Sequence, residues 1–324
     1  MKPLISDKDG QMIAFGPVPS RRLGRSLGIN NIPPKTCSYS CAYCQLGRTT
    51  KMQIERLGFY PPQRIHREVL RRVDEVRQTD EVIDYLTFVP DGEPTLDIHL
   101  GEAIDLLRPL GERIAVISNG SLLWRADVRR DLADADWVSV KVDAIDRVAW
   151  RKVDRPHKAL CLDRIRDGLL RFAEGFGGHL VTETMLIKGV HDDEEHVERI
   201  AAFVGRLRPA VAYLAVPIRP PAEVWVELPV MRSMIGAYQS FADHVDRVEF
   251  LVGYEGNEFA LSEGVEKSLL GITSVHPMRE EAVDELLAQA GEGWDTVRRM
   301  VAAGQLVELD YKGHAFYVRR VTGG

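Results

Sequence analysis

The stretches IDYLTFV (residues 83–89) and RIAVIS (residues 113–118) are short, apolar and rich in β-branched residues. Near-continuous apolar runs of this length are typical of strands that are buried on both faces, as they are in a parallel sheet. Similar runs recur at residues 26–32, 137–143, 180–187 and 211–218. Together these runs predict a largely parallel sheet.

Amphipathic segments with the period of helices lie between these runs. Ile65, Val69 and Val73 recur every four residues, with arginines on the opposite face. Residues 192–207 open with acidic side chains, which favour a helix N-terminus. About six β/α units fit residues 20–250, and this alternation predicts a parallel α/β fold, either a barrel or an open sheet.

A different pattern occupies the C-terminal part of the chain. Residues 278–291 and 293–305 have the pattern of two helices, and residues 306–320 have the pattern of a hairpin that turns at Lys312 and Gly313. Two helices followed by a hairpin resemble a winged helix. Basic and acidic side chains oppose one another here, so a structural role is favoured at least as much as nucleic-acid binding.

The change of pattern divides the chain into two expected domains. We expect a large α/β domain over residues 1–260 and a small winged-helix-like domain over residues 261–324.

The composition is that of an ordinary soluble globular protein, with 324 residues and a net charge of −6. This balance gives no overall preference for nucleic acid or an anionic membrane. The opening MKPLISDKDGQ lacks the apolar region of a secretory signal, and no apolar run approaches the roughly 20 residues that span a bilayer. We therefore expect a cytoplasmic protein with no membrane partner, whose clustered cysteines bind metal or do chemistry.

Three of the four cysteines lie within the eight residues CSYSCAYC. Cys37, Cys41 and Cys44 have the spacing C-x3-C-x2-C, which lets three thiolates converge on one metal centre such as an iron–sulfur cluster. A [4Fe–4S] cluster held this way would leave one iron open. The alternatives are a zinc site completed by a distant histidine or by Cys161, or three buried, inert cysteines. Cys161 itself is expected to be a core thiol on a helix.

With these cysteines and several further motifs, the sequence resembles the radical SAM enzymes. That family carries C-x3-C-x-aromatic-C, and here Tyr43 precedes the third cysteine. The further motifs follow in family order across residues 20–220. They are Gly92, Glu93 and Pro94 in PDGEPTL, Ser118 and Asn119 in VISNGS, Lys141 and Asp143 in VSVKVDA, and the segment MLIKGVHDDEE at residues 185–195.

The resemblance implies a partial (β/α)6 TIM-like barrel that binds a [4Fe–4S] cluster and S-adenosylmethionine. An electron donor of the flavodoxin or ferredoxin type would reduce the cluster. Cleavage of S-adenosylmethionine would then give a 5′-deoxyadenosyl radical that abstracts hydrogen from a substrate. The cofactors would carry the difficult step, and the protein would orient and shield the reactants.

The resemblance also implies roles for the motif residues. The three cysteines would hold the cluster, and the Tyr43 ring would lie beside the adenine. The other expected cofactor contacts are Gly92, Glu93 and Pro94 at the methionine ammonium, Ser118 and Asn119 at the ribose or carboxylate, Lys141 at the methionine carboxylate and Asp143 at a ribose hydroxyl. A structural ion pair between Lys141 and Asp143 is an equal alternative.

Two residues near strand ends are candidates for catalysis or substrate contact. Glu183 alternates with Met185 on the fifth predicted strand, so the two share a face that can look into the barrel. Arg219 follows the sixth predicted strand and could grip a phosphate or carboxylate through two hydrogen bonds.

Further polar residues are expected near the site. Arg21, Arg22 and Arg25 form either a phosphate-binding edge or a solvated loop. Tyr254 and Glu255 could belong to a lid, and His191 is expected to be a loop residue rather than a catalyst.

A closer resemblance connects the chain with the iron–sulfur oxidoreductases that include the wyosine-synthesis enzymes of tRNA. It favours a tRNA base as substrate, although the absence of a second cysteine cluster argues against the wyosine reaction itself. Activation of a glycyl-radical protein or attack on a small molecule are alternatives. A non-enzymatic iron–sulfur or zinc regulator that binds DNA is an alternative of another class, but it would not need the GEP motif.

Overall fold

The computed structural model describes residues 12–79, 81–252, 259 and 264–320. Its strands are β1 (Ala14–Ser20), β2 (Gly24–Ile29), β3 (Thr36–Cys37), β4 (Lys51–Met52), β5 (Tyr85–Phe88), β6 (Arg113–Ser118), β7 (Trp137–Lys141), β8 (His179–Met185), β9 (Val211–Ala215), β10 (Val248–Leu251), β11 (Met278–Arg279), β12 (Leu306–Tyr311) and β13 (His314–Arg319). Its α-helices are α1 (Pro62–Arg77), α2 (Leu100–Leu107), α3 (Ala126–Leu132), α4 (Arg147–Val153), α5 (Leu162–Gly175), α6 (Glu194–Leu207), α7 (Met231–Ala242), α8 (Val265–Thr273), α9 (Glu280–Ala290) and α10 (Asp295–Ala302). Two 3-10 turns, η1 (Pro94–Leu96) and η2 (Arg108–Leu110), complete the regular structure of the described residues.

The main sheet has eight strands in the order β1-β2-β5-β6-β7-β8-β9-β10. Every neighbouring pair from β2 to β10 is parallel, and only β1 pairs antiparallel with β2. In this order β1 and β10 lie at opposite edges, so the sheet of the described residues is open. The prediction of a mostly parallel α/β fold is confirmed.

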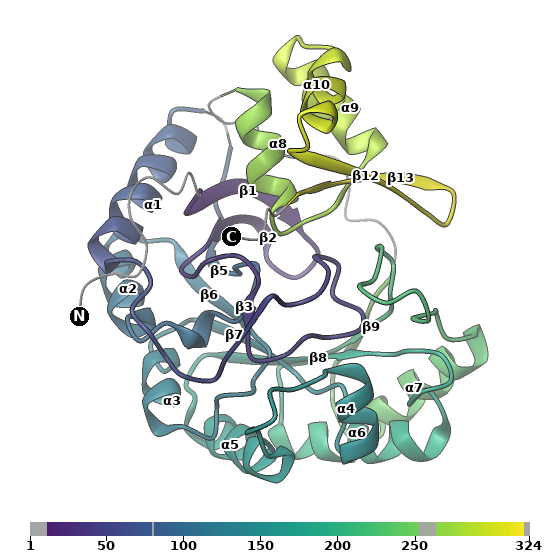
Figure 1. Ribbon diagram of the computed structural model, residues 1–324. Coiled ribbons are helices and arrows are strands. Elements are labelled where there is room, and N and C mark those ends of the chain that lie inside the picture. Colours follow the sequence, from purple (N-terminus) through teal and green to yellow (C-terminus); the bar gives the residue numbers. More distant parts are fainter. Residues whose placement is uncertain (1–11, 80, 253–258, 260–263, 321–324) are drawn as a thin grey trace.

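Helices α1, α2, α3, α5, α6 and α7 cover the outer side of this sheet (Figure 1). The buried positions of α1 include the predicted Ile65, Val69 and Val73, which join one continuous core with the strands. In α6 the side chain of Asp193 accepts a hydrogen bond from the backbone N–H of His196 and caps the helix. This cap satisfies an otherwise orphaned donor, as the acidic opening suggested.

The sheet contains two more strands than the sequence predicted. β1 was missed because its sequence AFGPVPS contains two prolines, which a central strand does not tolerate. An edge strand tolerates them, and β1 also has a register shift between Phe15 and Val18. β10 has only four residues, too few for a clear pattern.

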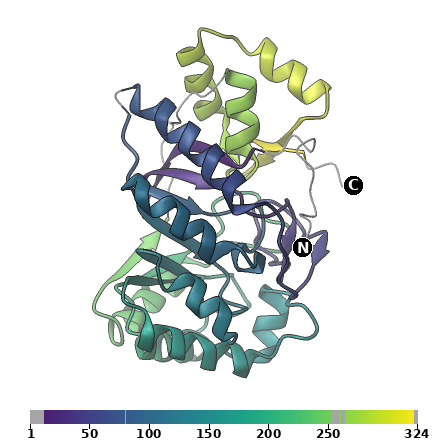
Figure 2. The same ribbon diagram turned by 90° about the vertical axis from the view of Figure 1, so that its left-hand side faces the viewer.

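The C-terminal elements α8 to β13 pack around a hydrophobic cluster of their own (Figures 1 and 2). They form three helices and a small antiparallel sheet in the order β11-β13-β12. The hairpin turns at Lys312 and Gly313, both with positive φ, as a two-residue type I′ turn requires. Helix α8, which was not predicted, packs against β1 and so attaches this unit to the sheet edge.

In the part of the chain that the structure describes, no helix combines the length and the apolar character needed to cross a bilayer.

Candidate active site

A cavity of about 290 Å³ opens where the parallel strands end. Its lining includes Cys37, Cys41, Tyr43, Cys44, Gly92, Glu93, Ser118, Asn119, Lys141, Glu183 and Arg219, all of which the sequence proposed for the site. Parallel strands bring their carboxyl ends to one edge, which is why residues far apart in the sequence meet here. Pro94 and Asp143 are not part of the lining.

The three clustered cysteines lie on a loop that begins at β3. In a turn of this loop, the Cys44 backbone amide donates a hydrogen bond to the Cys41 carbonyl at 3.1 Å. The Asn119 side-chain amide lies 3.5 Å from the Cys37 sulfur. Burial, followed by the nearby Glu93 carboxylate, raises the pKa of the Cys37 thiol to about 12. Burial likewise raises the pKa of Cys41 and of Cys44. A coordinating cation reverses this effect, because it deprotonates the thiols that bind it.

The donor set fits a cluster better than a single ion. The cavity lining offers three thiols, those of Cys37, Cys41 and Cys44. A zinc site needs four ligands at about 2.0–2.3 Å from one ion. In an iron–sulfur cluster the cysteine thiolates bind separate irons, so three thiols around one cavity are a suitable arrangement.

The Gly92–Glu93 segment runs beside the cysteine loop. The Glu93 amide donates to the Thr36 carbonyl at 3.1 Å, and a Cβ on Gly92 would lie 2.0 Å from that same oxygen. Any other residue at Gly92 would therefore force the two segments apart. The Glu93 carboxylate accepts hydrogen bonds from Thr95, Ser118 and the Asn119 amide.

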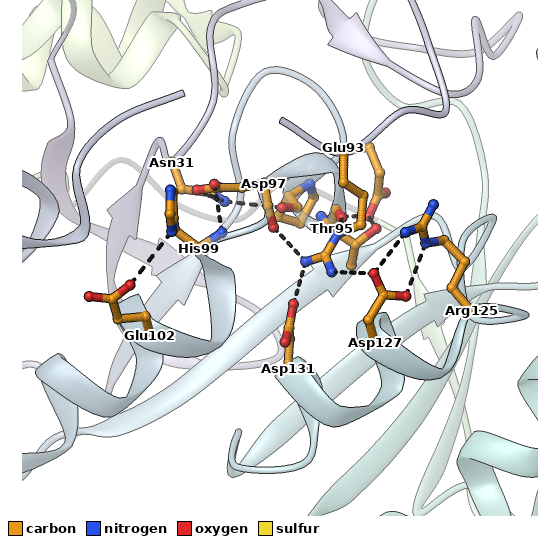
Figure 3. Close-up of polar contacts among 11 residues, drawn as sticks. Asn31, Glu93, Thr95, Asp97, His99, Glu102, Arg125, Asp127 and Asp131 are labelled. Carbon is orange, nitrogen blue, oxygen red and sulfur yellow. Dashed lines mark hydrogen bonds and ion pairs between the residues drawn. The ribbon is translucent and has the colours of Figure 1, made fainter. Parts of the chain in front are cut away.

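A buried arginine that the sequence did not reveal binds the backbone that follows Glu93. Arg56 donates to the carbonyls of Thr95 at 2.8 Å and Asp97 at 2.6 Å, and it forms ion pairs with Asp127 and Asp131. Figure 3 shows Asp127 and Asp131, both on α3, whose carboxylates pair with Arg56, and Asp97, whose backbone carbonyl accepts from it. Arg56 lies in the unremarkable stretch QIERLGFY, so no local signal marked it.

The side chains of Tyr43 and Asp143 form a hydrogen-bonded pair that the sequence did not suggest. The Tyr43 hydroxyl donates to Asp143, and the other oxygen of Asp143 accepts from the Met185 amide at 2.7 Å. Asp143 thus holds Tyr43 in position and does not face the cavity. Lys141 lies 5.2 Å from the centroid of the Tyr43 ring.

Glu183 accepts an ion pair on each oxygen, from Lys141 on one and from Arg22 on the other. The structural ion pair that was considered for Lys141 therefore involves Glu183 and not Asp143. Burial alone would raise the pKa of Glu183, but Lys141 and then Arg22 lower it to about 2. Of the arginines considered for a phosphate-binding edge, Arg21 and Arg22 line the cavity, whereas Arg25 pairs with Glu81 outside it.

The Glu183→Gln variant should be less stable by about 3 kcal/mol, because two partly buried cations, Lys141 and Arg22, lose their shared partner. A carboxyl whose folded pKa is lowered from 4.5 to about 2 stabilises the fold while it is ionised. The difference in unfolding free energy between the variant and the parent should therefore be constant from neutral pH down to about 4.5. It should shrink as the pH falls from there toward 2. Thermal unfolding measured across this range checks both points. Glu174→Gln, an exposed change on α5, is the control, and an equal loss there would contradict the assignment.

Arg219 connects the cavity with the C-terminal unit. It donates to the Gln45 side-chain oxygen at 2.6 Å and lies 3.2 Å from the His276 ring nitrogens. Gln45, next to the last cluster cysteine, also donates to the Val275 carbonyl at 2.9 Å. Val275 itself lines the cavity, so the C-terminal unit forms part of its wall.

The remaining expected residues are spread out. Cys161 is only partly buried, because it precedes α5 instead of lying within the helix core. His191 is a loop residue as expected, but it is buried and its Nε2 lies 2.8 Å from the Met185 carbonyl. Tyr254 and Glu255, considered for a lid, lie outside the described residues.

Comparisons with known proteins agree with this arrangement. The family model of the radical SAM superfamily matches residues 31–201, more than half of the chain and the part that holds the cysteines and most of the cavity. The chain belongs to the radical SAM superfamily. As a member it is an enzyme that uses a [4Fe–4S] cluster and S-adenosylmethionine, and the regulator alternative is set aside.

Several relatives of this radical SAM protein carry only a family designation. A UPF0026 protein of Methanocaldococcus jannaschii is 47% identical over 95% of this chain and 96% of its own length. A UPF0026 protein of Helicobacter pylori is 38% identical over 66% of this chain and 68% of its own.

Among solved structures, TYW1 with a lysine-pyruvate adduct bound has a TM-score of 0.51 at 17% identity, covering 68% of this chain and 74% of its own. SuiB of Streptococcus suis bound to S-adenosylmethionine has a TM-score of 0.52 at 13% identity. The match covers 70% of this chain and 50% of the SuiB chain. At these identities the two structures support the fold.

Proposed function

We propose that this radical SAM enzyme abstracts a hydrogen atom from an RNA substrate, a tRNA base in the first instance. The observation that carries the proposal is the charge of the cavity. Five cations line it, namely Arg21, Arg22, Lys35, Lys141 and Arg219, against the three carboxylates of Asp91, Glu93 and Glu183. An excess of cations in a partly enclosed site favours a substrate that carries phosphate.

The cofactors have a suitable place at one side of the cavity. Cys37, Cys41 and Cys44 would hold the cluster, which supplies the electron that cleaves S-adenosylmethionine to a 5′-deoxyadenosyl radical. Gly92 and Glu93 would meet the methionine ammonium, and Lys141 the carboxylate. Ser118 and Asn119 act through Glu93, since both donate hydrogen bonds to it.

Glu183 and Arg219 take positioning roles in this proposal. Glu183 orients Lys141 and Arg22 toward the cavity, because each of its oxygens pairs with one of them. Arg219 contacts His276 and so holds the C-terminal unit against the cavity. A flavodoxin or ferredoxin type of protein would supply the electron.

We assign residues 1–260 to a partial barrel and 261–324 to a winged-helix-like domain. The element order α8-β11-α9-α10-β12-β13 and the separate hydrophobic cluster support this division. Because Val275 lines the cavity, the small domain serves as a wall of the active site.

A weaker match supports a nucleotide-like substrate. A protein of Flammeovirga pacifica named S-adenosylmethionine-dependent nucleotide dehydratase is 26% identical over 51% of this chain and 58% of its own. A free nucleotide is accordingly the second candidate. It shares the phosphate chemistry of the cationic cavity but needs no extended binding surface outside it.

The test compares nucleosides from the tRNA of a strain that lacks this gene with those of its parent. We expect one modified nucleoside to be missing, and to return when that tRNA is incubated with reconstituted enzyme, S-adenosylmethionine and a reductant. Release of 5′-deoxyadenosine should accompany its return. An unchanged nucleoside profile would reject the tRNA version, and consumption of a free nucleotide from a metabolite extract would favour the second candidate.

A further inference from the structure

A second hollow lies beside the active site and carries a marked positive charge. It has a volume of about 490 Å³ and is lined by Arg151, Lys152, Arg155, Lys188, Gly189, Val190 and Trp225. The lining contains four cations and no acidic side chain among the described residues. We name this set the basic groove. Its charge contrasts with the net charge of −6 of the chain.

The basic groove is built at the same end of the sheet as the active site. Its residues come from the end of α4, from the loop after β8 and from the loop after β9. These segments follow the carboxyl ends of three adjacent parallel strands, β7, β8 and β9. Figure 1 shows α4 in front of these strands, near the cysteine loop.

The groove and the cysteine loop share one packed layer. Val153, Ile187 and Val226 pack with Ala42 and Tyr43 in a small hydrophobic cluster. Each of the three has a sequence neighbour in the groove lining, namely Lys152, Lys188 and Trp225. The Ala42 amide also donates to the Val153 carbonyl at 2.7 Å. A ligand in the groove is therefore held close to the cluster-binding loop.

The groove cations are accessible to a ligand. Arg151 and Lys152 are exposed, and within the described ranges neither has a carboxylate within ion-pair distance. Lys188 pairs with Glu227 at 2.7 Å, but both side chains are more than half exposed, so this pair is weak and open to exchange. Arg155 is less accessible, because it shares the Glu223 carboxylate with Arg48, but two cations on one carboxylate leave a net positive charge, and Arg48 is 71% exposed.

We propose that the basic groove binds the phosphate backbone of an RNA and so presents a nucleotide of that RNA to the active site. The inference rests on the proposed function and adds where the substrate lies. Cations from three segments suit a row of phosphates more than a single anion. Trp225, with Lys152 at 5.5 Å from its ring centroid, adds an aromatic surface of the kind that single-stranded RNA uses.

Binding of fluorescein-labelled bulk tRNA to the reconstituted full-length enzyme, followed by anisotropy, tests the proposal. The double variant Arg151→Gln, Lys152→Gln should weaken binding about tenfold or more. The slope of log affinity against log salt should fall by about 0.7 for each phosphate that the variant no longer neutralises. The matched control is Arg67→Gln, Arg171→Gln, which removes the same charge from exposed positions on α1 and α5. Iron content and circular dichroism show whether each variant is folded and loaded.

Retained affinity in the groove variant, or an equal loss in the control, would overturn the groove as the RNA site. Binding of polyglutamate at the groove without any RNA binding would assign the surface to an acidic protein and also overturn the proposal. A missing tRNA nucleoside together with groove-independent binding would leave the proposed function intact. Groove-dependent tRNA binding without a missing nucleoside would support the groove as an RNA site and reject the proposed modification of tRNA.

Discussion

The Cys41→Ala enzyme should release no more 5′-deoxyadenosine than a reaction without enzyme. Cys41 is one of three thiols around the cavity, and its replacement leaves only two of them. Mutation of a residue that only hydrogen-bonds to a metal ligand lowers metal affinity or activity about 10–100-fold. Loss of a ligand itself should lower activity by more than that. The measurement is anaerobic reconstitution with iron and sulfide, reduction, addition of S-adenosylmethionine and quantification of 5′-deoxyadenosine.

Cys161→Ala is the matched control, since it removes the one cysteine outside the motif. Cys161 precedes α5 and does not line the cavity, so its variant should keep both iron and cleavage activity. The same control tests whether Cys161 supplies a fourth metal ligand, as one form of the zinc alternative requires. Loss of metal from the Cys161 variant would contradict a cluster held by three cysteines.

Arg56→Met should lower the free energy of unfolding by about 3 kcal/mol. The Arg56 side chain is only 4% exposed, and its removal leaves Asp127, Asp131 and two carbonyls without their shared donor. The loss should lie at the lower end of the 3–5 kcal/mol expected for a broken buried pair. The reason is that Asp127 and Asp131 are 34% and 21% exposed and can recruit water.

Urea unfolding of the Arg56 variant against the parent measures this loss. Arg298→Met is the control because Arg298 pairs with Asp295 on the surface of α10, with 69% of its side chain exposed. An exposed pair of this kind contributes less than about 1 kcal/mol. Equal effects of the two substitutions would show that the network behind Glu93 has no special part in stability.

The sequence predicted six of the eight strands of the main sheet, because their two-sided burial leaves a continuous apolar run in each. It did not predict β1 and β10, whose edge positions remove the need for such a run. The C-terminal hairpin was predicted to the residue, since Lys312 and Gly313 carry the turn signal themselves. Helix α8 was missed, although it attaches the C-terminal unit to β1.

What the sequence by itself determined is local. The three cysteines lie within eight residues, and the GEP motif follows its strand directly, so their chemistry could be read without knowing the fold. What only the tertiary structure decided joins distant segments, as in the pairs of Glu183 with Lys141 and Arg22, the position of Arg56, and the basic groove. A buried charge costs free energy unless it is paired, so it pairs with an opposite charge that the fold places next to it. Spacing along the chain carries no trace of that choice.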